Sequence, residues 1–137
     1  MALPFADDQF DLIYSAEVLQ CVADLPALLA ELARVARPGG RVVVSTLNRT
    51  SLFRQAMRLV RKAVPRSGAP AHTPSVMRTA DEIVGSAHAS ALVVGRVCWV
   101  HFPFPWLWSP RSNRHLAEPL ASNMIVEFIK PARSGRS

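Results

Sequence analysis

The sequence is poor in cysteine and has no long apolar run, and both shortages exclude classes of protein. Its two cysteines, Cys21 and Cys98, cannot form a framework of several disulfides, and neither has the spacing of a zinc site. No apolar run reaches the ~18 residues that a membrane-spanning helix needs. The first eight residues lack the basic start and apolar stretch of a secretory signal. We therefore expect a reduced, cytoplasmic protein.

The composition suits one folded domain with an uneven charge. Of the 137 residues, 50% are hydrophobic and 19% are charged, which is enough apolar material for a core. Residues 1–48 carry 3 bases and 6 acids, whereas residues 49–137 carry 13 bases and 4 acids. Such a basic part can bind nucleic acid, an anionic membrane or anionic substrates, or it can reflect arginine-rich codon usage. Because no pattern of a nucleic-acid-binding motif accompanies the charge, we expect no nucleic-acid partner.

Hydrophobic patterning predicts a strand, a helix and a second strand within the first 46 residues. The apolar run 10–14 is typical of a strand. Asp24 is a suitable N-cap for a helix that continues through Arg37 and stops at Pro38-Gly39-Gly40. The β-branched run 42–44 then predicts a strand that is buried on both faces.

Strand, helix and strand in this order form a βαβ unit, so the two strands should be parallel. Ligands of parallel sheets bind beyond the carboxyl ends of the strands, which here are residues 15–17 and 45–48. Farther along, the pattern predicts a helix over 51–64 and a second helix that opens with the capping box Thr79-Ala-Asp-Glu82. The expected sheet has four strands, the last antiparallel, near residues 10–15, 41–46, 92–102 and 124–130.

Seven separated pieces of the first 46 residues resemble one family in order and spacing. They are Leu3-Pro-Phe5, Phe10-Asp-Leu-Ile13, Glu17-Val-Leu19, Val22-Ala-Asp24, Glu31-Leu-Ala-Arg-Val35, Pro38-Gly-Gly40 and Ser45-Thr46. This pattern is similar to that of class I S-adenosylmethionine-dependent methyltransferases, in the methyltransferase type 11 group. Residues 45–49 and the loop from Pro65 to His72 further resemble the branch that O-methylates ubiquinone precursors.

The resemblance implies a Rossmann-like α/β fold of which this chain holds the C-terminal half. The family's glycine-rich loop and its ribose-binding acidic residue have no counterpart here, because Gly39-Gly40 lies between a helix and a strand. The family's strand order, 3-2-1-4-5-7-6, would leave 4-5-7-6. We therefore expect residues 1–131 to form a partial methyltransferase domain, shortened at its N-terminus, and residues 132–137 to form a disordered tail.

The resemblance also implies the cofactor S-adenosylmethionine and transfer of its methyl group to an oxygen, nitrogen or carbon of a small molecule. It places the loop that follows the strand 10–15 against the cofactor. The candidate cofactor contacts are Leu3, Pro4, Phe5, Ser15, Ala16 and Glu17. The first three would flank the adenine, or they would only anchor the chain as a Pro-Phe turn.

The acceptor-side candidates are Asn48, Arg49 and His72. Asn48 and Arg49 follow a strand on the ligand side of the sheet and can hydrogen-bond a hydroxyl or a carboxylate. The alternative is an ordinary polar turn with Asn48 as a turn former. His72 can act as a base over the substrate, or it can be solvated. The sequence assigns no catalytic residue.

The chain departs from the ubiquinone branch where that branch has Glu-x-x-Glu-His, a segment associated with a divalent metal. Here the segment is Glu17-Val-Leu-Gln20-Cys21. Glutamine carries no charge and cysteine is too soft for magnesium, so we expect no metal site. Cys21 is then expected to be a small buried side chain.

The basic amphipathic helix 52–64 has two interpretations. Together with Trp99, Trp106 and Trp108 it can rest on an anionic bilayer, which suits an acceptor with a lipid tail. Alternatively, it packs its apolar stripe of Phe53, Met57, Val60 and Val64 on the sheet, and we favour this interpretation.

A shortened sheet would leave the strand 10–14 as an unpaired edge. Such an edge favours self-association or a partner chain. The alternative to a methyltransferase is therefore a non-catalytic remnant, or a module whose partner covers this edge.

Overall fold

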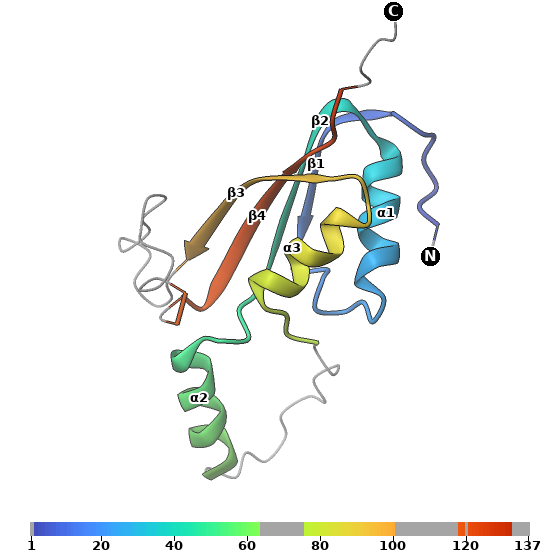
Figure 1. Cartoon of the computed structure of the whole chain (residues 1–137). Helices are drawn as coiled ribbons and strands as arrows, with labels where there is room; N and C mark the ends of the chain where they lie inside the picture. Colours follow the sequence, from blue (N-terminus) through green and yellow to red (C-terminus); the bar gives the residue numbers. More distant parts are fainter. Residues whose placement is uncertain (1, 64–75, 101–117, 120, 133–137) are drawn as a thin grey trace, which may run out of the picture.

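The computed structural model describes residues 2–63, 76–100, 118–119 and 121–132. His72, Trp106, Trp108 and all but Ala132 of the predicted tail lie outside them. The elements, in chain order, are β1 (Phe10–Ala16), α1 (Leu25–Val35), β2 (Ala36–Leu47), α2 (Leu52–Ala63), α3 (Ala80–His88), β3 (Val93–Val100) and β4 (Asn123–Ile129) (Figure 1).

The strands form one sheet in the order β1-β2-β4-β3. β1 and β2 are parallel, whereas β4 is antiparallel to both of its neighbours. The predicted βαβ unit and the predicted antiparallel last strand are therefore confirmed. This order is also the one that the resemblance implies, since β1, β2, β4 and β3 correspond to strands 4, 5, 7 and 6 of the family.

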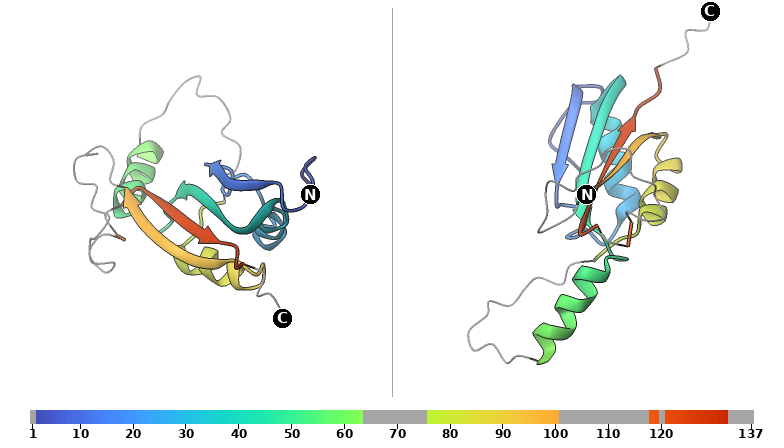
Figure 2. Two further views of the ribbon diagram at one scale, coloured as in Figure 1. Left: turned by 90° about the horizontal axis from the view of Figure 1, so that it is seen from above. Right: turned by 90° about the vertical axis from the view of Figure 1, so that its left-hand side faces the viewer.

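α1 and α3 cover one face of the sheet (Figure 2). Their apolar side chains form the core there together with those of the strands. The residues of β2 and β4 that point to this face are fully buried and include Val42, Val44, Val126 and Phe128. Burying such side chains contributes about 1.5–3 kcal/mol each. Both predicted helix starts are confirmed, because Asp24 accepts from the Ala27 N–H at 3.0 Å and Thr79 forms its capping box with Glu82.

β2 begins at Ala36 rather than near residue 41, so the prediction that the helix continues through Arg37 is wrong. Ala36 is already extended and pairs with Phe10, ahead of a shift in register. A Cβ on Gly40 would lie 2.8 Å from the Arg37 carbonyl oxygen and 3.1 Å from that of Phe10. Glycine at this position lets the backbone of β2 approach β1 directly after the helix.

The other face of the sheet is open within the described residues. Leu12, Tyr14 and Val93 are 55–64% exposed there, and Ile129 is 37% exposed. β1 is an edge strand of the described sheet, because only β2 pairs with it. Self-association through this edge stays a prediction.

α2 projects from the end of the sheet (Figure 1) instead of packing on it. Phe53, Met57 and Val60 of the predicted stripe remain 38%, 44% and 54% exposed, so the favoured interpretation of a stripe packed on the sheet is wrong. Val64, the fourth residue of the stripe, lies outside the described residues. Trp99 is buried in β3 and offers no ring to a membrane. Among the helices that the structure describes, none combines the length and apolar character needed to cross a bilayer.

The guanidinium of Arg34 fastens the residues that precede β1. It donates to Asp7 at 2.6 Å, to the Phe5 carbonyl oxygen at 2.9 Å and to both carboxylate oxygens of Glu31 at 3.0 Å. The Leu3 N–H also donates to Glu31, at 2.9 Å. These groups form the Arg34 cluster. Hydrogen bonds from Arg34, and then from Leu3, lower the pKa of Glu31 to about 2, while the carboxylates raise the pKa of Arg34.

Acid should weaken the Arg34 cluster. The pKa of Glu31 is about 2 in the folded chain, against an ordinary value of 4.5. Its stabilising contribution is therefore complete above the ordinary value and is lost as the pH falls from there through the folded pKa. We expect the melting temperature to fall over this window, and Glu31→Gln to reduce the fall. Circular dichroism melts at stepped pH measure both, and an equal fall in the variant would contradict the prediction.

Candidate functional site

The carboxyl ends of β1 and β2 meet at one end of the sheet, from which α2 projects (Figure 1). Ala16, the last residue of β1, pairs with Ser45. Leu47, the last residue of β2, pairs with Asn123 at the start of the antiparallel β4. We name residues 15–17, 47–49 and 122–123 the carboxyl edge. It is the candidate site, because ligands of parallel strands bind beyond their carboxyl ends.

The loop after β1 turns sharply at the carboxyl edge. Glu17 has a φ of +59°, and its N–H donates to the Ser45 carbonyl oxygen at 2.9 Å. A left-handed conformation at a non-glycine residue costs of order 1–3 kcal/mol and is frequent at ligand sites. Ser15 is buried, whereas Ala16 is exposed. The loop therefore presents backbone, the methyl group of Ala16 and the half-buried carboxylate of Glu17, and a flat ligand can approach the first two closely.

A chain of hydrogen bonds crosses the carboxyl edge from the loop after β1 to α2. Asn123 donates through Nδ2 to Glu17 Oε1 at 3.2 Å and accepts through Oδ1 from Arg54 Nη2 at 2.8 Å. Arg54 Nε also donates to the Ser122 carbonyl oxygen at 2.7 Å. Burial lowers the pKa of Arg54, and the charge of Glu17 opposes this change. The guanidinium stays cationic, so one amide joins an anion and a cation across the edge.

Sequence reasoning missed Arg54 and Asn123. The pattern places Arg54 among the basic residues of an amphipathic helix, where nothing distinguishes it from its neighbours. Asn123 stands 106 residues beyond Glu17, and no motif joins them. The one available signal is topological, because an antiparallel last strand must begin where the parallel strands end.

Asn48 is fully buried and holds the turn between β2 and α2. Its Nδ2 donates to the carbonyl oxygens of Glu118 and Ala121 at 2.7 and 3.0 Å. Its Oδ1 accepts from the N–H and hydroxyl of Thr50 at 3.1 and 2.7 Å. These four bonds use both amide hydrogens and both lone pairs. They support the turn-forming role of Asn48 and leave its amide no free group for a substrate.

Arg49 lies beside Asn48 and is held by an exposed ion pair. Its Nη1 is 2.8 Å from Glu82 Oε1, and the two side chains are 53% and 39% exposed. Such surface pairs contribute about 0–1 kcal/mol, so Arg49 can exchange this partner for a ligand. His72, the third acceptor-side candidate, lies outside the described residues.

Leu3, Pro4 and Phe5 are not brought to the carboxyl edge. The Phe5 ring packs edge-to-face on that of Phe10, with centroids 5.0 Å apart. Phe10 begins β1, and the strand from there to Ala16 is about 20 Å long at ~3.3 Å per residue. The contacts of residues 3–5 with α1 and Phe10 favour the anchoring role, and their place beside a cofactor stays a prediction.

No described group of three or more His, Cys, Asp or Glu side chains is arranged to hold a metal ion. The Oε1 of Gln20 is buried without a hydrogen-bond partner. Cys21 is exposed, so the prediction of a buried thiol is wrong; its Sγ lies 3.9 Å from the Glu17 carbonyl oxygen. The expected absence of a metal stays a prediction.

Asn48→Ala should destabilise the chain because it leaves four partners of the amide unsatisfied in a buried turn. The loss should be of order 1–3 kcal/mol in the free energy of unfolding. Urea unfolding followed by circular dichroism measures it. Asn123→Ala is the control, since that side chain is only partly buried and makes two bonds. Equal losses in the two variants would contradict the structural role of Asn48.

Residues 1–44 match the model of a protein family described as a methyltransferase domain. The ubiquinone biosynthesis O-methyltransferase of Aeromonas salmonicida is 32% identical over 129 residues, which cover 90% of this chain and 50% of that protein. The malonyl-[acyl-carrier protein] O-methyltransferase of Erwinia pyrifoliae is 51% identical over 51 residues, which cover 37% of this chain and 20% of that protein. The chain thus spans about half of the length of the Aeromonas protein and a smaller share of the Erwinia protein.

A solved structure from Thermotoga maritima shares the fold. It is a SAM-dependent methyltransferase described as a possible histamine N-methyltransferase, with a TM-score of 0.68 and 18% identity. The match covers 93% of this chain and 59% of that one. The predicted methyltransferase-type α/β sheet is therefore confirmed. The sequence matches make residues 1–44 part of a methyltransferase domain, and the chain has the fold of S-adenosylmethionine-dependent methyltransferases.

Proposed function

We propose that residues 1–131 form the acceptor-facing part of a methyltransferase that transfers the methyl group of S-adenosylmethionine to an oxygen of a small molecule. The observation that carries this proposal is the loop 15–17, which stands at the carboxyl edge of a sheet with the family's strand order. The extended similarity to a ubiquinone biosynthesis O-methyltransferase favours oxygen over nitrogen or carbon. The shorter match to a malonyl-[acyl-carrier protein] O-methyltransferase also favours oxygen.

The residues present fit one side of the cofactor. Ser15 and Ala16 end β1, and Glu17 turns the chain sharply, so a flat ring can lie against the backbone and the exposed methyl group of Ala16. They would hold the adenine and methionine ends. The sequence has no counterpart of the glycine-rich loop or of the ribose-binding acid. When bound, the cofactor supplies a methyl group that is already activated by a positively charged sulfur.

The chain's own residues would act mainly by positioning the acceptor. Holding two reactants in line supplies much of the rate of a transfer reaction. Asn48 would fix the turn that carries Arg49, and Arg49 would release Glu82 to bind an acceptor hydroxyl or carboxylate. His72 stays the candidate for a base above the acceptor.

Cofactor contact can be tested on the 137-residue chain itself. We expect S-adenosylhomocysteine to shift the amide NMR signals of residues 15–17 and 47–49, with low affinity because one side of the site is represented. Ala16→Leu should remove these shifts by filling the surface. Ala89→Leu, at an exposed residue beyond the far end of α3, should leave them unchanged. No shift at residues 15–17 under saturating ligand would remove the claim of cofactor contact for this chain.

A second role, attachment to an anionic membrane surface, rests on α2. Its residues include four bases and no acid. Leu52, Met57, Leu59 and Val60 are exposed on one side of the helix, whereas Arg54, Gln55 and Arg58 lie around the other. Such a helix suits the boundary between lipid headgroups and acyl chains, from which an acceptor with a lipid tail can be drawn.

Vesicle sedimentation tests this attachment. The chain should pellet with vesicles that contain phosphatidylglycerol at low salt, and it should be released by salt or by replacing that lipid with phosphatidylcholine. Leu59→Glu should reduce pelleting strongly because it places a charge on the apolar side. Gln55→Glu makes the same charge change on the polar side and should reduce it less. A chain that stays in solution with the anionic vesicles rules out the attachment.

A further inference from the structure

Arg54 is a partly buried cation whose hydrogen-bond partners are neutral. Arg34, Arg37, Arg41 and Arg49 each form an ion pair with a carboxylate. Arg54 instead donates to a backbone carbonyl oxygen and to an amide oxygen. Taking a charge out of water is costly unless an opposite charge compensates it. Glu17 compensates this charge only in part, because it reaches Arg54 through the amide of Asn123 and not by direct contact. An anion that docks beside Arg54 would complete the compensation.

The guanidinium is also held in a fixed orientation. Nε and Nη2 bind two successive residues, Ser122 and Asn123, at the start of β4. Nη1 has no hydrogen bond to any residue in the described part of the chain. A planar guanidinium fixed along one side presents its remaining N–H groups in a geometry that suits a carboxylate or other ionised oxygen.

Arg54 lies beside the proposed cofactor contacts and is not one of them. Its anchors, Ser122 and Asn123, lie at the carboxyl edge on the far side of β2 from β1, while Asn123 reaches back to Glu17. The cofactor contacts proposed above lie at the end of β1. A group bound at Nη1 would thus lie at the carboxyl edge, beside the turn of Asn48 and Arg49.

We propose that Arg54 binds the methyl acceptor through an ionised oxygen, either a carboxylate or a phenolate. This inference rests on the proposed function, because it assigns the acceptor to the same carboxyl edge. An ionised oxygen is the nucleophile that methyl transfer to oxygen needs. When the acceptor is a phenol, its proton passes to water, and the adjacent guanidinium favours the charged form.

The probe for this site is 4-nitrophenol, whose ionisation is visible in its absorbance. In the presence of excess 137-residue chain, the bound phenol should ionise at a pH lower by roughly one unit, as expected for a group beside an opposite charge. Arg54→Gln should abolish this shift and weaken binding at least about tenfold, since a unit of pKa is a factor of ten in the equilibrium. An unchanged shift in Arg54→Gln overturns the proposal.

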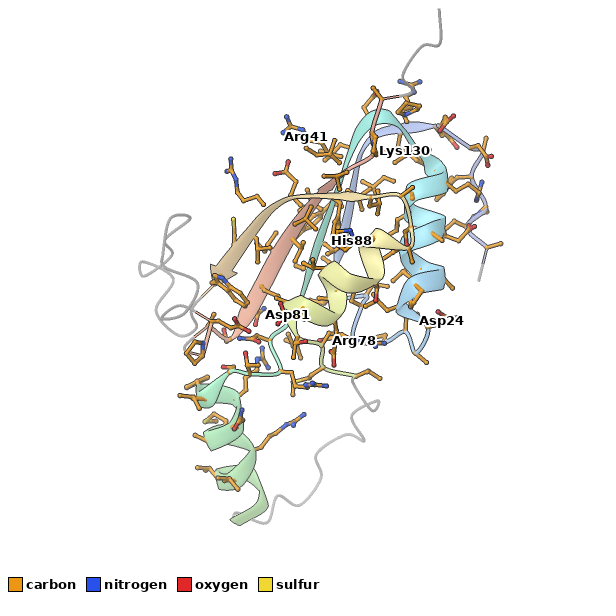
Figure 3. The ribbon with its side chains drawn as sticks, viewed as in Figure 1. Asp24, Arg41, Arg78, Asp81, His88 and Lys130 are labelled. Carbon is orange, nitrogen blue, oxygen red and sulfur yellow. The ribbon has the colours of Figure 1, made fainter. Side chains whose placement is uncertain are left out.

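Two variants separate the role of Arg54 from general charge and from folding. Arg41→Gln removes the same charge at the opposite end of the sheet (Figure 3) and should leave 4-nitrophenol binding unchanged. Arg54→Lys keeps the charge without the guanidinium fork, so it should retain part of the pH shift while weakening affinity. If Arg41→Gln lowers binding as much as Arg54→Gln, non-specific attraction explains it and the proposal fails.

Benzoate distinguishes the two kinds of acceptor. Displacement of 4-nitrophenol by benzoate supports a carboxylate acceptor at Arg54, and binding of 4-nitrophenol without displacement supports a phenolate.

Neither measurement uses the cofactor. If Arg54→Gln weakens anion binding but the cofactor shifts no NMR signals at residues 15–17, the proposed function alone is therefore contradicted. If the cofactor shifts the NMR signals of residues 15–17 but anion binding is unchanged in Arg54→Gln, this inference alone is contradicted.

Discussion

The arrangement of the molecule depends on β2, which pairs in parallel with β1 and antiparallel with β4. The parallel pairing requires α1 to return the chain to the starting end of the sheet, so the ends of β1 and β2 coincide. The antiparallel pairing brings the start of β4 to the same place. Residues from three distant parts of the sequence thereby meet at the carboxyl edge, and α2 leaves from that point. The chemistry of the site follows from this double pairing rather than from a local motif.

Features governed by local chemistry could be predicted from the sequence. Asp24 and Thr79 cap helices because their side chains reach backbone N–H groups a few residues away. The run 42–44 forms a central strand because its β-branched side chains suit burial on a pleated surface. The family resemblance added the strand order, which spacing alone does not contain. The caps and the strand could be predicted from residues that are close in the sequence, and the strand order could be predicted from a known family pattern.

The remaining features depend on which distant groups come together. The early start of β2 requires the Phe10 carbonyl to approach Gly40, and sequence spacing does not reveal that distance. An amphipathic pattern in α2 shows that one side is apolar but not what covers it, so packing on the sheet was a wrong inference. The sequence around Asn48 is typical of an exposed turn. Its amide nevertheless donates to carbonyl groups some 70 residues away, and these bonds hold it in a buried turn. Arg54 gains significance only because β4 delivers Asn123 to it.

The Arg34 cluster has a consequence for the accuracy of strand pairing. β1 touches a single neighbour in the described sheet, and a slip of one residue would exchange the side chains of its two faces. Leu12 and Tyr14 would then turn inward while Ile13 and Ser15 turned outward. The bonds from α1 to Leu3, Phe5 and Asp7 fix the chain just before β1 enters the sheet, so only one alignment with β2 keeps them intact. The Arg34 cluster, which lies outside the sheet, thus sets the register of a strand that pairs with only one other strand in the described part of the chain.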